Sequence, residues 1–392
     1  MRRFGDNTRK SAGVLLRRFL SVLLCMAFLL ASTGCTPGTT TVTTPAVQGQ
    51  YGTYKRFSKD IVGLFNTVIS IIGYSETQAD FDRYAAMAEK RFTELHQFYD
   101  IYNAYDGMTN LYSVNMAAGG APLAVSPEII DLLAFCQDAV KTVGNRVDIT
   151  LGAMLAIWSD YRDAGRANPA GAALPPMESL RAAAKLSGMD ALEVDRTAGT
   201  VRLAKAGMRI DVGAVAKGFA TGIVERELSA AGWGSFLISN GASSISLHGR
   251  PFQDGKETWS IGIQNPSALL PEPGQTTAGQ ENYLAVAQLI DRSIGNSGDY
   301  QNYYAVNGVY YNHLIDPDTL MPATTYRGVS VFTDDCAMAD LLSSTLFLLP
   351  YAEGRALIES LAGVDAIWIY TGGRVEMTPG ISAALSTRPP NT

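Results

Sequence analysis

The alternation of apolar and polar residues is clearest between residues 303 and 315, which read YYAVNGVYYNHLI. Such alternation is typical of β-strands, and the Asn307-Gly308 pair between the two arms is the strongest short-range signal for a hairpin. We therefore expect one strand to rise from the turn at residues 297–299. Its partner then returns toward His313.

The returning strand is expected to end at Asp316, because Pro317 cannot donate a hydrogen bond to a neighbouring strand. His313 and Asp316 then lie near a strand terminus, at the rim of a sheet. Catalytic side chains are common in such places, so both residues are candidates for catalysis.

Apolar residues recur at helical spacing from Ala337 to Leu349, after a further strand at residues 328–332. Asp340 and Ser344 are four residues apart in this predicted helix, so they lie on one face of it. A carboxylate and a hydroxyl directed to one point in space suit a hard cation.

The remaining pattern predicts strands and helices in turn. Strands are predicted at 65–74, at 236–247 with an internal turn, and at 259–264, 283–289, 366–370 and 374–377. Helices are predicted at 77–102, 126–144, 177–186 and 351–361, with a loop at 164–176 and a hairpin around 197–199. The strand spacing suits an antiparallel sheet. His96 is interpreted as a packed or surface residue, and His248 as a residue on the solvent side of its strand.

The first 34 residues are interpreted as a signal peptide. Six basic residues precede an apolar run, Phe19–Ala31, which is too short to span a bilayer comfortably as a permanent anchor. The run ends at Gly34-Cys35, which resembles a lipobox apart from Ser32, so we expect Cys35 to carry the lipid. An uncleaved anchor and ordinary signal cleavage are the alternatives, and each puts the mature chain outside the cytoplasm.

Composition separates a tether from one large domain. Residues 35–50 are rich in threonine, proline and glycine and are predicted to be a flexible tether. Residues 51–392 can bury a large core. Removing residues 1–34 removes six basic residues and Asp6, so the formal net charge falls from −6 to −11. Such an acidic surface argues against nucleic-acid binding.

Two cysteines, Cys136 and Cys336, belong to the domain. Both lie beside apolar helical positions, so they are interpreted as buried thiols, with a disulfide as the alternative. No Cys-His spacing in the sequence suggests a zinc site.

The segment from Arg209 to Ala220 (RIDVGAVAKGFA) ends a strand at Asp211 and opens a helix that runs to about Ala231. Its small residues allow a ligand to approach the backbone, and a helix start offers unpaired N–H groups to phosphate oxygens. Lys217 adds a positive charge to the same turn.

Several motifs, in order along the chain, resemble those of the ApbE family, the flavin:protein FMN transferases. The matching segments are SGDY from Ser297, HLIDPDTLMP from His313 and ADLLSS from Ala339, with FNTVISIIGY, VDITLGAMLAIW and IDVGAVAKGFA upstream. Together they cover almost all of the chain after residue 60. Several separated motifs in one order are far more specific than any single motif.

The resemblance implies a fold and a reaction. The fold is α+β, with a largely antiparallel sheet core, flanking helices and a cofactor cleft between two lobes, so residues 51–392 become one ApbE-like domain. The reaction cleaves FAD, releases AMP and attaches FMN through a phosphoester bond to a threonine or serine of a target redox protein. The family's acceptor motif has Ser or Thr before Gly-Ala.

The resemblance also implies roles for single residues. His313 matches the family's general base, although a lone histidine in a strand would otherwise be interpreted as a hydrogen-bonded structural residue. Asp316 could orient His313, hold the metal indirectly or cap the turn before Pro317. The Ala214 carbonyl, Asp340 and Ser344 form an oxygen set that favours Mg²⁺.

The flavin nucleotide is expected to contact a further group of residues. These are Tyr102, Tyr105, Asp211, Lys217, Asn240, Ser297 and Asp299. A flavin ring could stack on Tyr102 or Tyr105, while the alternative is that both tyrosines only pack their loop.

The chain departs from the family pattern in two places. After Asn240-Gly241, where the family usually has a double glycine, this chain has Ala242 and Ser243. After Pro317, where the family usually shows Arg-Thr-Gly-Tyr-Pro, this chain has Asp-Thr-Leu-Met-Pro. These changes alter charge and backbone freedom beside His313.

Three functions remain open from the sequence. The preferred one is an FMN transferase that is anchored outside the cytoplasm and modifies secreted or membrane redox proteins. The second is Mg²⁺-dependent hydrolysis of FAD to FMN and AMP. The third is a lipoprotein that binds a flavin without catalysis, which would have no need for Asp340 and Ser344 beside His313.

Overall fold

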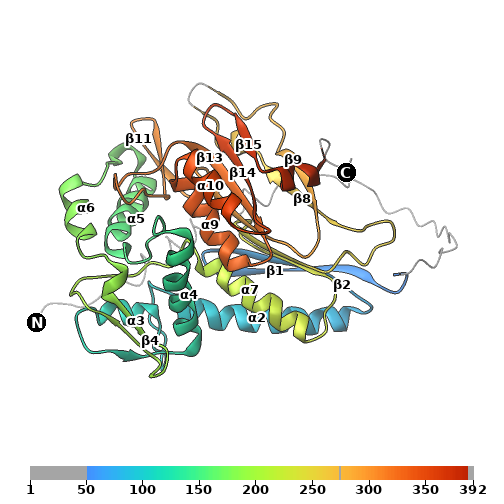
Figure 1. Ribbon diagram of the computed structural model, residues 1–392, viewed down its shortest axis with the longest axis horizontal. Coiled ribbons are helices and arrows are strands. Elements are labelled where there is room, and N and C mark those ends of the chain that lie inside the picture. Colours follow the sequence, from blue (N-terminus) through green and yellow to red (C-terminus); the bar gives the residue numbers. More distant parts are fainter. Residues whose placement is uncertain (1–50, 273–274, 387–392) are drawn as a thin grey trace, which may run out of the picture. The chain divides into compact units, whose positions relative to one another are not determined.

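The structure, a computed structural model, describes residues 51–272 and 275–386, and its largest element is an eight-stranded antiparallel sheet (Figure 1). In spatial order the strands are β1 (Lys55–Leu64), β2 (Thr67–Ser75), β6 (Phe236–Asn240), β7 (Ser244–His248), β10 (Ser293–Gly298), β13 (Tyr326–Thr333), β14 (Asp365–Tyr370) and β15 (Val375–Met377). The signal peptide at 1–34 and the tether at 35–50 lie outside the described residues and stay predictions.

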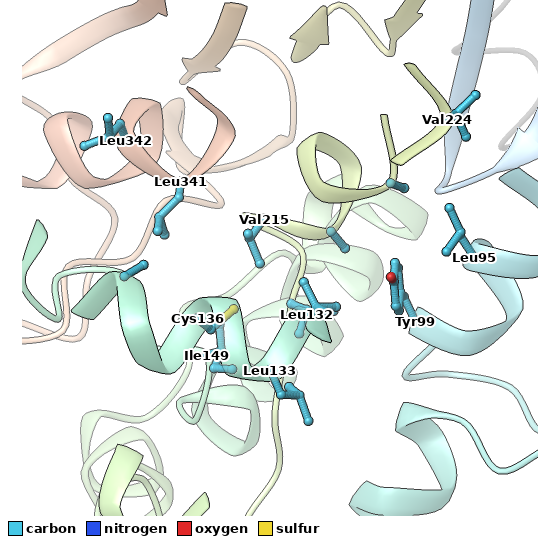
Figure 2. Packing of buried hydrophobic residues seen from close by; sticks show 14 of the residues in the cluster. Leu95, Tyr99, Leu132, Leu133, Cys136, Ile149, Val215, Val224, Leu341 and Leu342 are labelled. Atoms are coloured by element: carbon cyan, nitrogen blue, oxygen red, sulfur yellow. The ribbon is translucent and has the colours of Figure 1, made fainter. Parts of the chain in front are cut away.

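Three helices pack on one face of this sheet: α2 (Gln78–Tyr99) on β1 and β2, α7 (Ala216–Ala230) on β6 and β7, and α9 (Cys336–Leu348) on β10 and β13. α7 and α9 approach closely, because a Cβ on Gly218 would lie 2.3 Å from the carbonyl oxygen of Cys336. Figure 2 shows the apolar core under these helices, with Val224 of α7 and Leu341 and Leu342 of α9 packed among residues of α2 and α4 (Pro127–Val143).

The opposite face of the sheet is covered by a smaller, three-stranded sheet. Its order is β16 (Leu385–Ser386), β9 (Tyr283–Leu289) and β8 (Trp259–Gln264), flanked by α11 (Pro379–Ala384). Side chains such as Ile261 of β8 and Phe332 of β13 share one apolar cluster. β13 is therefore buried on both faces along its whole length.

The other elements join these layers. The helices are α3 (Leu111–Met116), α5 (Gly152–Ala167), α6 (Met177–Ala184), α8 (Pro266–Leu269) and α10 (Tyr351–Ser360), with 3₁₀ turns at Pro169–Gly171 and Met189–Ala191. A small sheet has the order β3 (Leu123–Ala124), β5 (Thr200–Leu203), β4 (Leu192–Asp195), and a hairpin pairs β11 (Tyr303–Val306) with β12 (Val309–Asn312). The hairpin shares a core with α5 and α6 that includes Trp158, Leu180 and Leu320.

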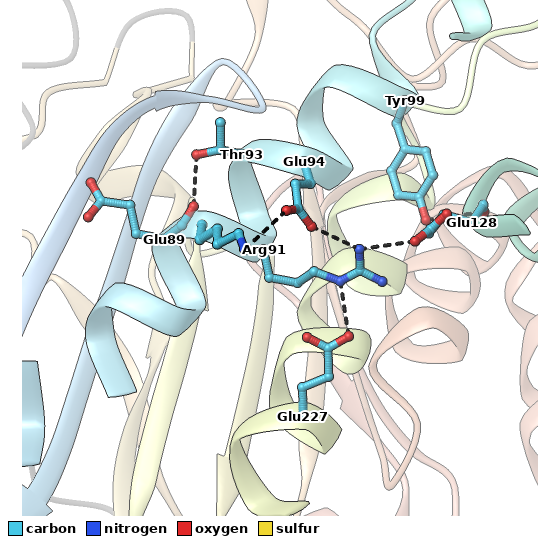
Figure 3. Close-up of polar contacts among 8 residues, drawn as sticks. Glu89, Arg91, Thr93, Glu94, Tyr99, Glu128 and Glu227 are labelled. Atoms are coloured by element: carbon cyan, nitrogen blue, oxygen red, sulfur yellow. Dashed lines mark hydrogen bonds and ion pairs between the residues drawn. The ribbon is translucent and has the colours of Figure 1, made fainter. Parts of the chain in front are cut away.

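Arg91 ties three helices together on the outside (Figure 3). Its guanidinium lies 3.0 Å from Glu128 of α4 and 3.0 Å from Glu227 of α7, and 3.2 Å from Glu94 of its own helix. These carboxylates raise the pKa of Arg91 against the effect of burial. Arg91, Glu128 and Glu227 also line a surface hollow of about 350 Å³.

Most predicted elements are confirmed, including the antiparallel α+β class and the hairpin. Asn307 and Gly308 both have positive φ, 50° and 79°, as a type I′ turn requires. The predicted burial of Cys136 and Cys336 is also confirmed, and both thiols are unpaired. No helix in the described segments is long and apolar enough to cross a bilayer.

Several predictions about single segments were wrong. Phe65 and Asn66 form a turn with φ of 51° and 54°, and β1 before them was missed because it is an edge strand with mostly polar, exposed positions. Residues 209–211 form no strand beyond one bridge from Arg209 to Leu151, and residues 164–167 continue α5 instead of starting a loop. Ser297 and Gly298 end a strand and do not form a turn.

His248 also differs from its prediction. Its ring is half-buried, with Nδ1 2.8 Å from Glu225 Oε1 and Nε2 3.2 Å from Ser229 Oγ. The His248 ring also stacks on the ring of Phe236. His248 therefore joins β7 to α7 and does not face solvent freely.

Candidate active site

Asp340 is a buried carboxylate, 3% exposed, on the face of α9 that meets α7. Its Oδ2 accepts a hydrogen bond of 2.8 Å from the backbone N–H of Gly218. Burial raises its pKa, and the charge of Lys217 is the largest opposing effect. Among the described residues no cationic side chain forms an ion pair with it, so the site can accept a cation from outside the chain.

Glycine at two positions allows α9 to lie where it does. A Cβ on Gly295 of β10 would be 1.9 Å from the carbonyl oxygen of Ala339, and one on Gly218 would be 2.5 Å from the Cβ of Asp340. Real Cβ atoms do not approach that closely. The two glycines therefore fix the depth of Asp340 between the sheet and α7.

Ser344, one helical turn after Asp340, is 5% exposed. Its hydroxyl lies 3.0 Å from the hydroxyl of Ser297 in β10, which also lies 2.9 Å from Ser343. The structure thus brings Ser297 and Ser344 together across the α9–β10 contact. The expected contact of Ser297 with the flavin nucleotide stays a prediction.

The turn before α7 is held by Asp211, whose Oδ1 accepts from the N–H of Gly213 at 2.8 Å. Burial raises the pKa of Asp211. Nearby cations oppose this shift, and Arg162 has the largest effect among them. Lys217 donates to the Gly213 carbonyl at 3.2 Å. Ala214 follows Gly213, and within the described residues no backbone N–H bonds to its carbonyl.

β12 ends at Asn312 and not at Asp316 as expected, so His313 lies just after the strand. Its Nδ1 is fully enclosed with no hydrogen-bond partner among the described residues. Burial, together with the charges of Arg162 and Lys217, lowers the pKa of His313 to about 3. The imidazole is therefore neutral at physiological pH. A buried polar atom without a partner in a native site calls for an explanation, such as a ligand or a catalytic role.

Asp316 caps the turn that follows His313. Its Oδ1 accepts from the backbone N–H groups of Asp318 at 2.8 Å and Thr319 at 3.2 Å, and lies 3.8 Å from the guanidinium of Arg146. Of the three roles considered for Asp316, turn capping is the one with contacts in the structure. Its assignment to catalysis stays a prediction.

The two candidate tyrosines lie in different settings. Tyr105 donates from its hydroxyl to Asp100 Oδ2 at 2.8 Å, a contact within its own loop. Tyr102 is 57% exposed. Its pKa is nevertheless raised to about 12, mainly by partial burial and next by the charge of Asp211. Tyr102 therefore lies near Asp211 with an exposed ring, whereas Tyr105 is bound to its loop.

Asn240 and Asp299 lie on either side of the sheet centre. Asn240 is fully buried at the end of β6 and directs its Nδ2 toward the Lys217 carbonyl at 3.5 Å, while its Oδ1 has no partner. Asp299 follows β10 and lies 2.6 Å from Arg327 Nε. Burial raises the pKa of Asp299 to about 6 despite Arg327.

Sequence reasoning missed Arg162, which acts electrostatically on three of the predicted site residues. Its charge opposes the raised pKa values of Asp211 and Tyr102 and adds to the lowering of the His313 pKa. Arg162 comes four residues after Trp158 in α5, and this helical spacing was the available signal.

Lys217 and Arg162 thus connect part of the predicted site. Tyr102, Asp211, Lys217, His313 and Asp340 are linked to one another through the charges of these two cations. Within the segments that the structure describes, no three His, Cys, Asp or Glu side chains gather as a metal site. Any cation held here would depend on Asp340, neutral oxygens and a ligand.

Comparison with known proteins gives consistent results. The profile of the ApbE family matches residues 65–368. An FAD:protein FMN transferase of Treponema pallidum (strain Nichols) is 32% identical over 310 residues, which cover 76% of this chain and 80% of that protein. An FAD:protein FMN transferase of Klebsiella pneumoniae (strain 342) is 24% identical over 285 residues, with coverage of 72% and 82%.

Solved structures resemble the fold. The ApbE protein of Thermotoga maritima superposes with a TM-score of 0.71 at 20% identity, over 86% of this chain and 100% of that one. The flavin transferase ApbE of Vibrio cholerae superposes with a TM-score of 0.68 at 20% identity, over 84% and 99%. At this identity the likeness concerns the fold.

Proposed function

The chain belongs to the ApbE family, and on that premise we propose that it transfers FMN from FAD to a threonine or serine hydroxyl of a target protein and releases AMP. The observation that carries the proposal is the buried carboxylate of Asp340, held by the Gly218 N–H and without a cationic side-chain partner, in reach of the same Lys217 charge that acts on His313. A protein that only binds a flavin has no need for such a carboxylate.

The residues present fit a Mg²⁺ ion. Asp340 has one carboxylate oxygen that is not bonded to Gly218, the Ala214 carbonyl accepts no backbone N–H among the described residues, and Ser344 supplies a hydroxyl. An all-oxygen set with few protein ligands is what Mg²⁺ prefers when it also binds substrate phosphates. When bound, the ion would neutralise charge on the diphosphate of FAD.

In the proposed reaction, His313 accepts the proton of the target hydroxyl. Its neutral ring has an enclosed nitrogen, Nδ1, without a partner, and a base must be unprotonated at working pH. The hydroxyl oxygen attacks the phosphorus of the FMN moiety and its proton passes to His313. The bond from that phosphorus to the bridging oxygen breaks, and AMP leaves with that oxygen.

The location of the protein is part of the proposal. The basic and apolar leader ending at Cys35 supports export and attachment to the membrane through a lipid on that residue. The targets would then be secreted or membrane redox proteins with a Ser/Thr-Gly-Ala type acceptor motif. A mass measurement of the mature N-terminus would test the lipid, and a mature chain that retains residues 1–34 would contradict it.

The transfer is tested with the purified full-length chain, FAD, Mg²⁺ and a protein that carries the acceptor motif. Target mass and AMP release are followed together, with His313→Ala and Asp340→Ala as variants. A gain of one FMN on the target, lost in both variants, supports the transferase. AMP and FMN without target labelling would support hydrolysis, and FAD binding without cleavage would favour a flavin-binding lipoprotein.

A further inference from the structure

Arg162 is an arginine inside the candidate site that lacks an ion-pair partner. Its Nε is enclosed and makes no hydrogen bond, and its Nη2 donates to Ser159 Oγ at 2.8 Å. Among the described residues no carboxylate lies within ion-pair distance, whereas Arg91 and Arg327 are both paired with carboxylates. An enclosed donor without a partner costs free energy, so a group from outside the chain is expected to satisfy it.

The position of Arg162 is fixed by neighbours on the same face of α5. Trp158, one turn earlier, donates from Nε1 to the Leu320 carbonyl at 3.0 Å. Arg166, one turn later, donates from Nε to the Tyr303 carbonyl at 2.7 Å. This face of α5 therefore packs on the β11–β12 hairpin, which leads directly into His313.

The charge of Arg162 reaches three residues that come from three separate segments. Of the charged groups around His313 and Asp211, Arg162 has the largest effect, and it lowers the pKa of both residues. It also acts against the raised pKa of Tyr102. A cation that acts on all three lies close to the point where the segments converge. That point is open on one side, because Tyr102 is 57% exposed.

We propose that Arg162 binds the diphosphate of the flavin nucleotide through its guanidinium, whose Nε has no hydrogen-bond partner among the described residues. The inference rests on the proposed function and assigns a residue that holds the phosphates. A planar guanidinium matches phosphate oxygens with two parallel hydrogen bonds, which lysine cannot do. When the diphosphate is cleaved, Arg162 also stabilises the charge that develops on the departing AMP phosphate.

The test compares FAD with riboflavin, which has the same ring system and no phosphate. Binding to the full-length chain is measured with Mg²⁺ for wild type, Arg162→Gln and Arg162→Lys. Arg202→Gln serves as the control. Arg202 lies outside the candidate site, and its guanidinium is paired with Glu193 at 2.8 Å. We expect Arg162→Gln to weaken FAD binding by about 10- to 100-fold, the range for hydrogen bonds to charged groups, and to leave riboflavin binding unchanged. Arg162→Lys should recover only part of the affinity.

A structural role for Arg162 would give a different result. The variant would then lose riboflavin and FAD equally, and its melting temperature without ligand would fall. If the role of Arg162 is to bind phosphate, the Arg162→Gln chain without ligand should melt at or above the wild-type temperature. Equal loss of both ligands, or wild-type FAD affinity in the variant, would overturn the proposal.

The outcomes also separate this inference from the proposed function. If the wild-type chain binds FAD and transfers FMN, and Arg162→Gln binds FAD as tightly, only the role of Arg162 fails. If the wild-type chain neither binds FAD nor transfers FMN, the proposed function fails and the role of Arg162 fails with it.

Discussion

The backbone N–H of Gly218 donates to the carboxylate of Asp340 at 2.8 Å, across 122 residues of sequence. Gly218 is the third residue of α7, so its N–H has no acceptor within the helix, and the Asp340 carboxylate satisfies it. One contact therefore orients the carboxylate at the start of α7. The Ala214 carbonyl, which precedes the helix, accepts no backbone N–H among the described residues.

Gly218→Ala is expected to destabilise the protein and reduce FMN transfer. The new Cβ would lie 2.3 Å from the Cys336 carbonyl oxygen and 2.5 Å from the Asp340 Cβ, so α7 and α9 must separate. Overpacking of this kind costs about 1 to 3 kcal/mol. Urea unfolding and target labelling measure the two effects.

Gly222→Ala, one turn later in α7, is the matched control for this prediction. Its Cβ would meet only the end of the flexible Arg226 side chain at 3.4 Å and Cys336 Cβ at 3.7 Å. Replacing a helical glycine by alanine then stabilises by up to about 1 kcal/mol. Equal stability losses in both variants would contradict the role given to the Gly218 contact.

Local sequence signals predicted one half of the candidate site and not the other. The spacing of Asp340 and Ser344 follows from helix geometry alone, and the hairpin follows from Asn307-Gly308. The Gly218–Asp340 bond and the contact of Ser297 with Ser344 join segments 122 and 47 residues apart, and no local pattern encodes them.

The errors in the fold have physical causes as well. Phe65 lies in an aromatic and β-branched run that favours a strand, but the β1–β2 pairing forces it to positive φ. β1 was missed because an edge strand keeps most of its side chains exposed, so its apolar alternation is weak.

Leu320 is predicted to be a strained residue whose glycine variant is more stable than its alanine variant. It has φ of 60° and lies at the position where the family pattern has glycine, yet its side chain is only 7% exposed. Both variants lose about 2 to 5 kcal/mol of packing. Leu320→Gly regains about 1 to 2 kcal/mol, because only glycine adopts this conformation without strain.

Thermal or urea unfolding of both variants checks the order, with Leu180 as the control. Leu180 is fully buried in the same apolar cluster but lies inside helix α6. There Leu180→Gly should be less stable than Leu180→Ala by about 1 kcal/mol. The same order of stability at positions 320 and 180 would argue against strain at Leu320.

His313 is predicted to stay neutral throughout the working pH range. Burial, Arg162 and Lys217 lower its pKa to about 3, so its unprotonated form persists as the pH falls through 6.5, where an ordinary histidine becomes protonated. NMR titration of the imidazole nitrogens tests this, and Arg162→Gln should move the midpoint upward. A wild-type midpoint near 6.5 would contradict the enclosure of the ring.

His248 and Glu225 are predicted to stabilise the fold at low pH and less at high pH. The carboxylate, 2.8 Å from Nδ1, raises the pKa of His248, so the stabilisation is complete below the unfolded pKa near 6.5 and is lost as the pH rises through the higher folded pKa. Glu225→Gln should therefore lower the free energy of unfolding by about 1 to 3 kcal/mol near pH 5.5 and by less above the folded pKa. His96→Gln is the opposite control. Burial lowers the pKa of His96, so protonation of this histidine destabilises the folded chain at low pH. The variant should therefore gain most stability relative to wild type at low pH. A loss in Glu225→Gln that does not vary with pH would exclude the charged pair.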